Sequence, residues 1–248
     1  PQLLESLSCL CGLKDLSLTT NGILLQKYTK QLKTIGLKRL NISIDTLDDQ
    51  KFKYITRFGK LQDVLRGIDA ALKENFLVKL NVVIMRGLND NEILSFARFA
   101  RERQIIVRFI ELMPMANNSA VSQDLYISCD EVKDRLRALG SLKAVSVENY
   151  GSGPAQYYKI EEASLIVGFI GPISGRFCFD CNRLRLTSDG LLMPCLCSEA
   201  CLDLKRPLRE GREKEILDLI RKAIFLKPAE HNFGFSFPRQ CLMSEIGG

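Results

Sequence analysis

The first half of the sequence alternates apolar, strand-like stretches with amphipathic helical patterns, and this alternation limits the fold more than any other feature. The predicted strands span residues 14–19, 39–44, 78–85 and 105–112. Between them, apolar residues recur every three to four positions, as on one face of a helix. Successive strand–helix–strand units with right-handed crossovers place their strands side by side in a parallel sheet. We therefore predict an α/β fold, with too few units to close an eight-stranded barrel.

Several polar residues and one methionine lie at the ends of these predicted strands. They are Thr19, Asn21, Ser43, Asp45 and Met113. Because ligand sites in parallel α/β sheets form at the carboxyl ends of the strands, these positions are candidate site residues. Each of them, taken alone, is better explained as a turn or cap residue.

Lys79 is a charged residue inside a predicted strand, between Val78 and Leu80. Parallel strands are usually covered on both faces, so a lysine there needs an explanation. It lies either at a strand end, with its amine reaching solvent, or inside a pocket. In a pocket, its partner would be a carboxylate or a phosphate.

Two predicted helix starts contain a capping pair. Asn89 is followed three residues later by Glu92, and Ser128 by Glu131. In such a pair the first side chain accepts from a backbone amide of the first turn, and the second reaches back. We predict that both pairs begin helices in this way.

The second half of the sequence has shorter strand patterns. The predicted strands span 144–147, 155–160 and 165–170, and hairpin arms span 183–187 and 191–196 around Ser188-Asp189-Gly190. Short strands joined by turn signals predict antiparallel pairing. We place a boundary in the polar stretch after Met113, which gives a partial α/β domain over 1–114 and a C-terminal region over 115–248.

The hairpin is flanked by three cysteines, Cys178, Cys181 and Cys195, at the spacing Cys-x2-Cys-x13-Cys. Soft thiolates at this spacing suit either zinc or an iron–sulfur cluster. A closed zinc site would need a fourth ligand, such as Cys197 or Cys201. A cluster held by three cysteines would leave one iron open to a ligand. Buried free thiols without a metal are a third explanation.

Within the same block, Arg183 and Arg185 alternate with Leu184 and Leu186. Alternation is strand periodicity, so both guanidinium groups are predicted to project from one face. Arginine binds phosphate bidentately, so this block predicts a thiolate site next to an anion site.

The composition narrows the class of protein. Nine cysteines, an odd number, without a recognisable secretory signal favour reduced thiols in the cytoplasm. A single histidine, His231, argues against histidine-rich metal sites and a Ser-His-Asp triad. The net charge of +6 comes from scattered residues, and no apolar run is long enough to span a bilayer. We expect no nucleic acid and no membrane as partners.

With these residues assembled, the chain resembles the molybdenum cofactor biosynthesis protein A family, the GTP 3′,8-cyclases, which are radical S-adenosylmethionine enzymes and lyases. The matching segments are Thr19-Thr-Asn-Gly22, Asn41-Ile-Ser43-Ile-Asp45, Lys79-Leu-Asn-Val-Val83, Arg108-Phe-Ile-Glu-Leu-Met113, the block from Cys178 to Cys195, and Ile246-Gly-Gly248. They keep their order from one end of the chain to the other. The resemblance implies a partial (β/α) barrel of the radical S-adenosylmethionine type, followed by a region of antiparallel strands and helices.

The resemblance also implies ligands for individual residues. The cysteines Cys178, Cys181 and Cys195 would hold a C-terminal [4Fe–4S] cluster whose open iron binds GTP. The residues that would contact GTP are Thr19, Lys79, Arg183, Leu184 and Arg185. Those that would contact S-adenosylmethionine are Ser43 and Met113. The terminal Gly247-Gly248 would reach into the active site, although a disordered end is the default for a terminus.

One feature of the family is missing from the sequence. The Cys-x3-Cys-x2-Cys motif that holds the second [4Fe–4S] cluster, which cleaves S-adenosylmethionine to a radical, does not occur, and Cys9 and Cys11 have the wrong spacing. We expect a fragment or a truncated homologue that does not generate the radical alone. The resemblance further implies a product passed to cyclic pyranopterin monophosphate synthase, and is compatible with a homodimer and an unidentified electron donor. The alternatives are a zinc-stapled binding module without catalysis and another radical S-adenosylmethionine enzyme with an auxiliary cluster.

Overall fold

The computed structural model describes residues 1–113, 124–146, 150–151, 153–175, 178–179, 181–198 and 200–230. The chain forms two compact units, one of Pro1–Leu112 and Leu125–Gly171, the other of Met113–Asp124 and Pro172–Gly248. The predicted boundary between residues 114 and 115 stays a prediction, because the chain leaves the first unit there but returns to it at Leu125. The predictions for His231 and Gly247-Gly248 lie outside the described residues.

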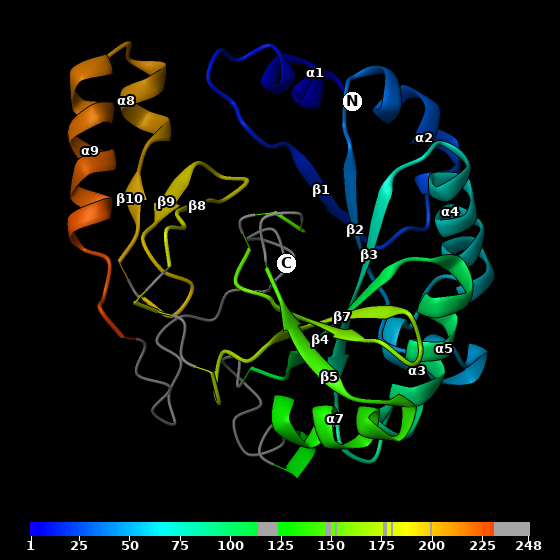
Figure 1. Cartoon of the computed structure of the whole chain (residues 1–248). Coiled ribbons are helices and arrows are strands. Elements are labelled where there is room, and N and C mark those ends of the chain that lie inside the picture. The colour runs from blue at the N-terminus through cyan, green and yellow to red at the C-terminus, as the bar shows by residue number, and fades with distance from the viewer. Residues whose placement is uncertain are drawn as a thin grey trace. The chain divides into compact units, whose positions relative to one another are not determined.

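The first unit is built on a seven-stranded sheet with the order β1-β2-β3-β4-β7-β6-β5 (Figure 1). The parallel strands are β1 (Ser17–Thr20), β2 (Arg39–Ser43), β3 (Leu77–Ile84), β4 (Ile106–Glu111) and β7 (Leu165–Ile170). The strands β6 (Gln156–Ile160) and β5 (Leu142–Val145) continue the sheet in antiparallel pairs. The predicted α/β fold with a parallel sheet is thus confirmed, and within the described residues the sheet is open at both edges.

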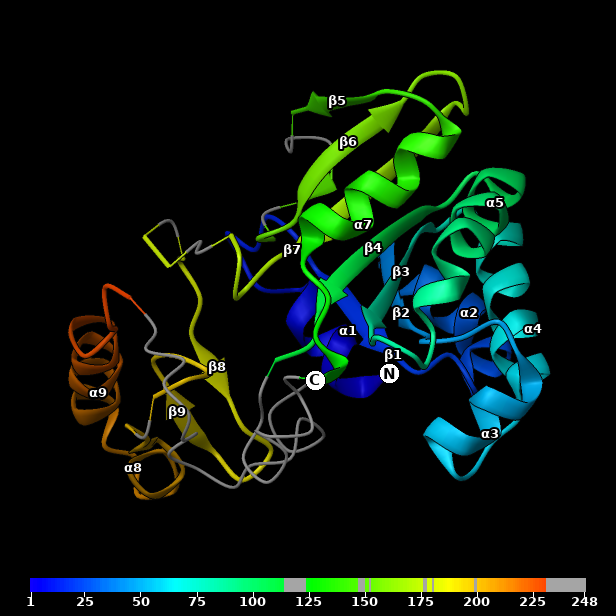
Figure 2. The ribbon, with the colours of Figure 1, turned by 90° about the horizontal axis from the view of Figure 1, so that it is seen from below.

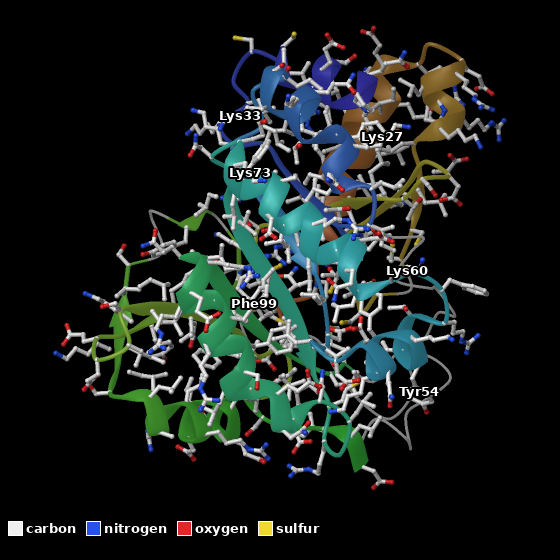
Figure 3. The ribbon with its side chains drawn as sticks, turned by 90° about the vertical axis from the view of Figure 1, so that its right-hand side faces the viewer. Lys27, Lys33, Tyr54, Lys60, Lys73 and Phe99 are labelled. Carbon is white, nitrogen blue, oxygen red and sulfur yellow. The ribbon has the colours of Figure 1, made fainter. Side chains whose placement is uncertain are left out.

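Helices cover one face of this sheet (Figures 1 and 2). They are α2 (Leu25–Thr34), α4 (Leu61–Lys73), α5 (Ile93–Arg103) and α7 (Cys129–Leu136), with the shorter α1 (Gln2–Ser8), α3 (Asp49–Thr56), η1 (Asp90–Glu92) and η2 (Arg137–Leu139) at their sides. Their apolar stripes pack on strand residues such as Leu40, Leu80 and Val107, which are fully buried. Figure 3 looks onto this helical layer, where Lys27, Lys33 and Lys73 lie spread over α2 and α4. None of the helices among the described residues is long and apolar enough to cross a membrane.

The opposite face of the sheet has a different chemistry. Successive side chains of a strand point to opposite faces, so the residues between the buried apolar ones share the second face. On β2 these are Arg39, Asn41 and Ser43, and on β3 they include Lys79 and Asn81. We call this second face, which also bears Thr19, Arg108 and Tyr157, the polar face.

The second unit contains a three-stranded antiparallel sheet of β8 (Arg185–Leu186), β9 (Leu191–Met193) and β10 (Leu202–Asp203), followed by α8 (Lys205–Arg209) and α9 (Glu213–Phe225). The predicted hairpin is confirmed, although its strands are shorter than expected. Gly190 has a φ of +89°, and a Cβ there would lie 2.8 Å from the Cβ of Lys205. Only glycine therefore fits this turn without strain.

Candidate functional site

Two rows of residues cross the polar face in register. In the first row, Thr19 of β1 lies opposite Asn41 of β2, which lies opposite Lys79 of β3. The second row, two residues further along, contains Ser43, Asn81, Arg108, Gly168 and Tyr157. Register partners on neighbouring strands lie close together on the same face. The sheet therefore brings together three of the predicted site residues, Thr19, Ser43 and Lys79.

Lys79 is buried on this face, with only 1% of its surface exposed. Its ammonium donates to the backbone carbonyl of Tyr150 and, over 3.1 Å, to the hydroxyl of Tyr157. Burial, followed by the positive charges of Arg108 and Arg39, lowers the pKa of Lys79 to about 7. The interpretation of Lys79 as an amine that reaches solvent is thus wrong, and it lies in an enclosed environment whose hydrogen-bond partners here are neutral.

Arg108 is a second buried cation on the polar face, and it is not among the predicted site residues. Its exposed fraction is 8%, and its Nε donates to Asn81 Oδ1 over 2.8 Å. Burial is the main cause that lowers its pKa, whereas Tyr157 acts in the opposite direction. A Cβ at Gly168 would lie 2.9 Å from Arg108 Cγ and 3.0 Å from the Tyr157 ring. Glycine at this position therefore makes room for both side chains.

The charges on this face are predominantly positive. Besides Lys79 and Arg108, the face bears Arg39, whose guanidinium pairs with Asp15 over 2.6 Å and contacts the carbonyl of Tyr150 over 3.4 Å. Asp15 is itself more exposed than Arg39. Two cations buried among neutral partners are unfavourable unless an anion approaches them. The polar face therefore has the electrostatics of an anion-binding site.

The ends of β2 and β3 are tied together by Asp45 and Asn89. The Asp45 carboxylate accepts from Val83 N over 2.8 Å, and burial raises its pKa to about 6. The fully buried Asn89 donates to the carbonyls of Asp45 and Val83 over 2.6 and 2.8 Å and accepts from Met85 N over 2.7 Å. These bonds fix the strand ends next to Ser43, which is itself exposed.

The predicted capping pair of Asn89 and Glu92 is wrong, because both side chains have partners elsewhere in the fold. Glu92 accepts from Thr46 Oγ1 over 2.8 Å, from Leu47 N over 2.7 Å and from Lys51 Nζ over 2.9 Å. The second pair is half confirmed: Ser128 accepts from the backbone amide of its partner over 3.2 Å, as a cap should. The carboxylate of that partner instead binds the arginines at positions 86 and 135.

The described cysteines of the second unit, at positions 178, 181, 195, 197 and 201, are half-buried and form no disulfide with one another. The backbone amide of Cys181 donates to the carbonyl of Cys178 over 3.1 Å, which closes the Cys-x2-Cys turn, and Cys195 follows the end of β9. In the part of the chain that the structure describes, no three His, Cys, Asp or Glu side chains are grouped to hold a single metal ion. Three soft thiolates at this hairpin nevertheless fit a [4Fe–4S] cluster in the chemistry of the donor set, one for each of three irons.

The exposure of the side chains alternates along the stretch from Arg183 to Leu186. Leu184 and Leu186 are exposed by 36% and 62%, whereas Arg183 and Arg185 are half-buried. Lys227 Nζ fixes the approach to β8 by donating to the carbonyl of Arg183 over 2.8 Å.

One more thiol lies in this neighbourhood. The amide of Cys197 donates to Cys195 Sγ over 3.4 Å. The hydrogen bond with Cys195 and burial raise the pKa of the Cys197 thiol, and Arg185 acts in the opposite direction. The charge of Arg185 therefore acts on the Cys197 thiol.

Met113 lies two residues beyond the end of β4 and is half-buried. It belongs to the second unit, whereas Ser43 belongs to the first. The joint assignment of these two residues to S-adenosylmethionine stays a prediction.

Comparisons with known proteins identify the family. A model described as Radical SAM superfamily matches residues 2–100, and one described as Molybdenum Cofactor Synthesis C matches residues 105–233. A GTP 3′,8-cyclase of Moorella thermoacetica is 46% identical over 248 residues, which cover 99% of this chain and 76% of the relative. A relative of the same name from Thermodesulfovibrio yellowstonii is 44% identical, and the match covers 99% of this chain and 76% of the relative. Another, from Peptoclostridium acidaminophilum, is 46% identical, with 99% of this chain and 74% of the relative covered. The chain therefore belongs to the GTP 3′,8-cyclase family of the radical S-adenosylmethionine superfamily.

Proposed function

We propose that the protein acts in molybdenum cofactor biosynthesis by converting GTP to 3′,8-cyclo-7,8-dihydro-GTP in an S-adenosylmethionine-dependent radical reaction. The family supports this reaction, and the observation that carries it in this chain is the block in which Arg183 and Arg185 stand between the Cys178-x2-Cys181 pair and Cys195. A zinc staple alone would not need two arginines on one side of the hairpin.

We assign the auxiliary [4Fe–4S] cluster to Cys178, Cys181 and Cys195. When bound, such a cluster supplies one iron without a protein ligand, to which an oxygen or nitrogen of the substrate can bind. Arg183 and Arg185 contribute positive charge beside the thiols, which suits a substrate with a triphosphate. The motif Cys-x3-Cys-x2-Cys does not occur within residues 1–248, so these residues supply no thiolates for the second cluster.

We assign GTP also to Thr19 and Lys79 of the first unit and to Leu184 of the second. Lys79, with Arg108 beside it, offers buried positive charge for phosphate oxygens, and Thr19 offers a hydroxyl on the same face. S-adenosylmethionine is assigned to Ser43 and Met113. The product would pass to cyclic pyranopterin monophosphate synthase. A homodimer is compatible with the proposal. The reaction also needs an electron donor, which the proposal leaves unspecified.

The test of the cluster is anaerobic reconstitution with iron and sulfide, followed by electron paramagnetic resonance and metal analysis. We expect a cluster signal in the wild-type protein that is lost in Cys195→Ala. Cys9→Ser is the matched control, because this exposed thiol lies outside the block and its loss should leave the signal unchanged. One zinc per chain without iron or sulfide would refute the proposal in favour of a zinc-stapled module.

The test of the substrate is equilibrium binding of GTP. We expect affinity to fall when Arg183 and Arg185 are both replaced by alanine. GTP binding that survives this double replacement would instead favour another radical S-adenosylmethionine enzyme with an auxiliary cluster.

A further inference from the structure

Asn41 contains a buried polar atom that no described residue satisfies. The side chain lies in the first row of the polar face and has an exposed fraction of 9%. Its Nδ2 donates to Thr19 Oγ1 over 3.3 Å. Its Oδ1 is buried and has no hydrogen-bond donor among the residues described for this structure. A buried acceptor without a partner is rare in native proteins and points to a missing ligand or ordered water.

The neighbours of Asn41 show what kind of molecule lies there. Its register partners on either side are Thr19 and Lys79, the two residues of this unit assigned to GTP. The ammonium of Lys79 is already directed to Tyr150 and Tyr157, so it does not satisfy the amide oxygen. The unsatisfied oxygen therefore lies between two proposed substrate contacts, on the same face of the sheet.

The chemistry of GTP then limits which part of it can bind here. An ionised triphosphate presents only acceptor oxygens, and an acceptor cannot satisfy another acceptor. The hydroxyls of the ribose and the N–H groups of the guanine are donors. Building on the proposed function, we infer that Asn41 is a substrate-contact residue whose Oδ1 accepts a hydrogen bond from a ribose hydroxyl or the guanine 2-amino group of GTP, next to the cations that attract its phosphates.

This inference is tested by calorimetric binding of GTP and of three analogues, each lacking one donor: 2′-deoxy-GTP, 3′-deoxy-GTP and inosine triphosphate. Asn41→Leu keeps the number and branching of the side-chain heavy atoms and removes the acceptor, together with the Nδ2 donor to Thr19. We expect it to weaken GTP binding about 3- to 10-fold, the loss typical of one hydrogen bond. We also expect the analogue that lacks the contacted donor to bind the wild-type and variant proteins equally, which identifies that donor.

Asn89→Ala is the matched control, because the buried Asn89 amide is satisfied by the backbone. Asn89→Ala should lower stability and leave the ratio of affinities for GTP and the analogues unchanged. Asn41→Leu should leave the melting temperature of the ligand-free protein within a few degrees of the wild-type value. The inference is refuted if the Asn41→Leu protein binds GTP as tightly as the wild type does. It is also refuted if the substitution weakens the binding of GTP and of all three analogues equally, or weakens the binding of S-adenosylmethionine instead. If the wild-type protein binds no GTP, the proposed function falls as well, so the two failures are distinguishable.

Discussion

Replacing Lys79 by methionine should make the ligand-free protein more stable at low pH while weakening its binding of GTP. The pKa of Lys79 lies at about 7, compared with 10.5 for a lysine in water. Each unit of this pKa difference corresponds to about 1.4 kcal/mol by which the folded protein disfavours the charged form. At pH 6 the buried ammonium therefore lowers the free energy of unfolding by on the order of 3–5 kcal/mol. Lys79→Met removes this cost and loses two hydrogen bonds worth about 1 kcal/mol each. We expect a net gain of roughly 1–3 kcal/mol in the free energy of unfolding at pH 6.

The pH dependence gives this prediction its sign. Between pH 7 and 10.5 the unfolded chain keeps the proton on Lys79 and the folded chain does not, so stability increases with pH over this range. From pH 6 to pH 9 the advantage of Lys79→Met over the wild type should therefore shrink by about 2–3 kcal/mol. Urea unfolding at both pH values measures this difference.

The control for that experiment is Lys27→Met, at an exposed position on α2 (Figure 3). It should change stability by less than about 0.5 kcal/mol at either pH. A Lys79→Met protein that is less stable than the wild type at pH 6, or whose difference in stability from the wild type does not change with pH, would refute the reasoning.

The burial of Lys79 also implies that GTP binding near pH 7 takes up a proton. Calorimetry in buffers of different ionisation enthalpy would detect this proton uptake.

Three further predictions follow from the geometry. Asn89→Ala removes three hydrogen bonds between strand ends and should lower the free energy of unfolding in urea by about 2–4 kcal/mol. Gly168→Ala places a methyl group against Arg108 and Tyr157 and should cost about 1–3 kcal/mol of stability and weaken GTP binding; unchanged affinity would show that the Arg108 position is not critical. Arg185→Lys should lose most of the GTP affinity that Arg185→Ala loses, because an ammonium does not replace a bidentate guanidinium; full retention in a binding titration would contradict the bidentate contact.

The strands of the first unit could be predicted from the sequence because buried parallel strands contain apolar runs that end at turns. The pairing of β4 with β7 could not, since more than fifty residues separate Glu111 from Leu165 and no local pattern records such a pairing. The capping pair of Asn89 and Glu92 failed for a related reason. Its local spacing was correct, but the backbone at the ends of β2 and β3 bound Asn89, and Thr46, Leu47 and Lys51 bound Glu92.

The candidate site was predictable where a polar residue interrupts an apolar strand, and Lys79 was found in this way. Arg108 has the same sequence pattern, because it stands between Val107 and Phe109 as Lys79 stands between Val78 and Leu80. The unsatisfied oxygen of Asn41 has no signal in the sequence, because it depends on where the donors of neighbouring strands point.

The polar face is itself an argument for function. Strands of a parallel sheet are usually covered on both faces and then read as continuous apolar runs. Here β2 alternates Arg39, Asn41 and Ser43 with buried Leu40 and Ile42. On this face Asn41, Lys79 and Arg108 are buried. Burying such side chains without full partners costs free energy, and stability alone would replace them with apolar residues. Their presence in a buried parallel sheet is best explained by a polar ligand that supplies the missing partners, and the stability gained by Lys79→Met at the expense of binding would measure that exchange directly.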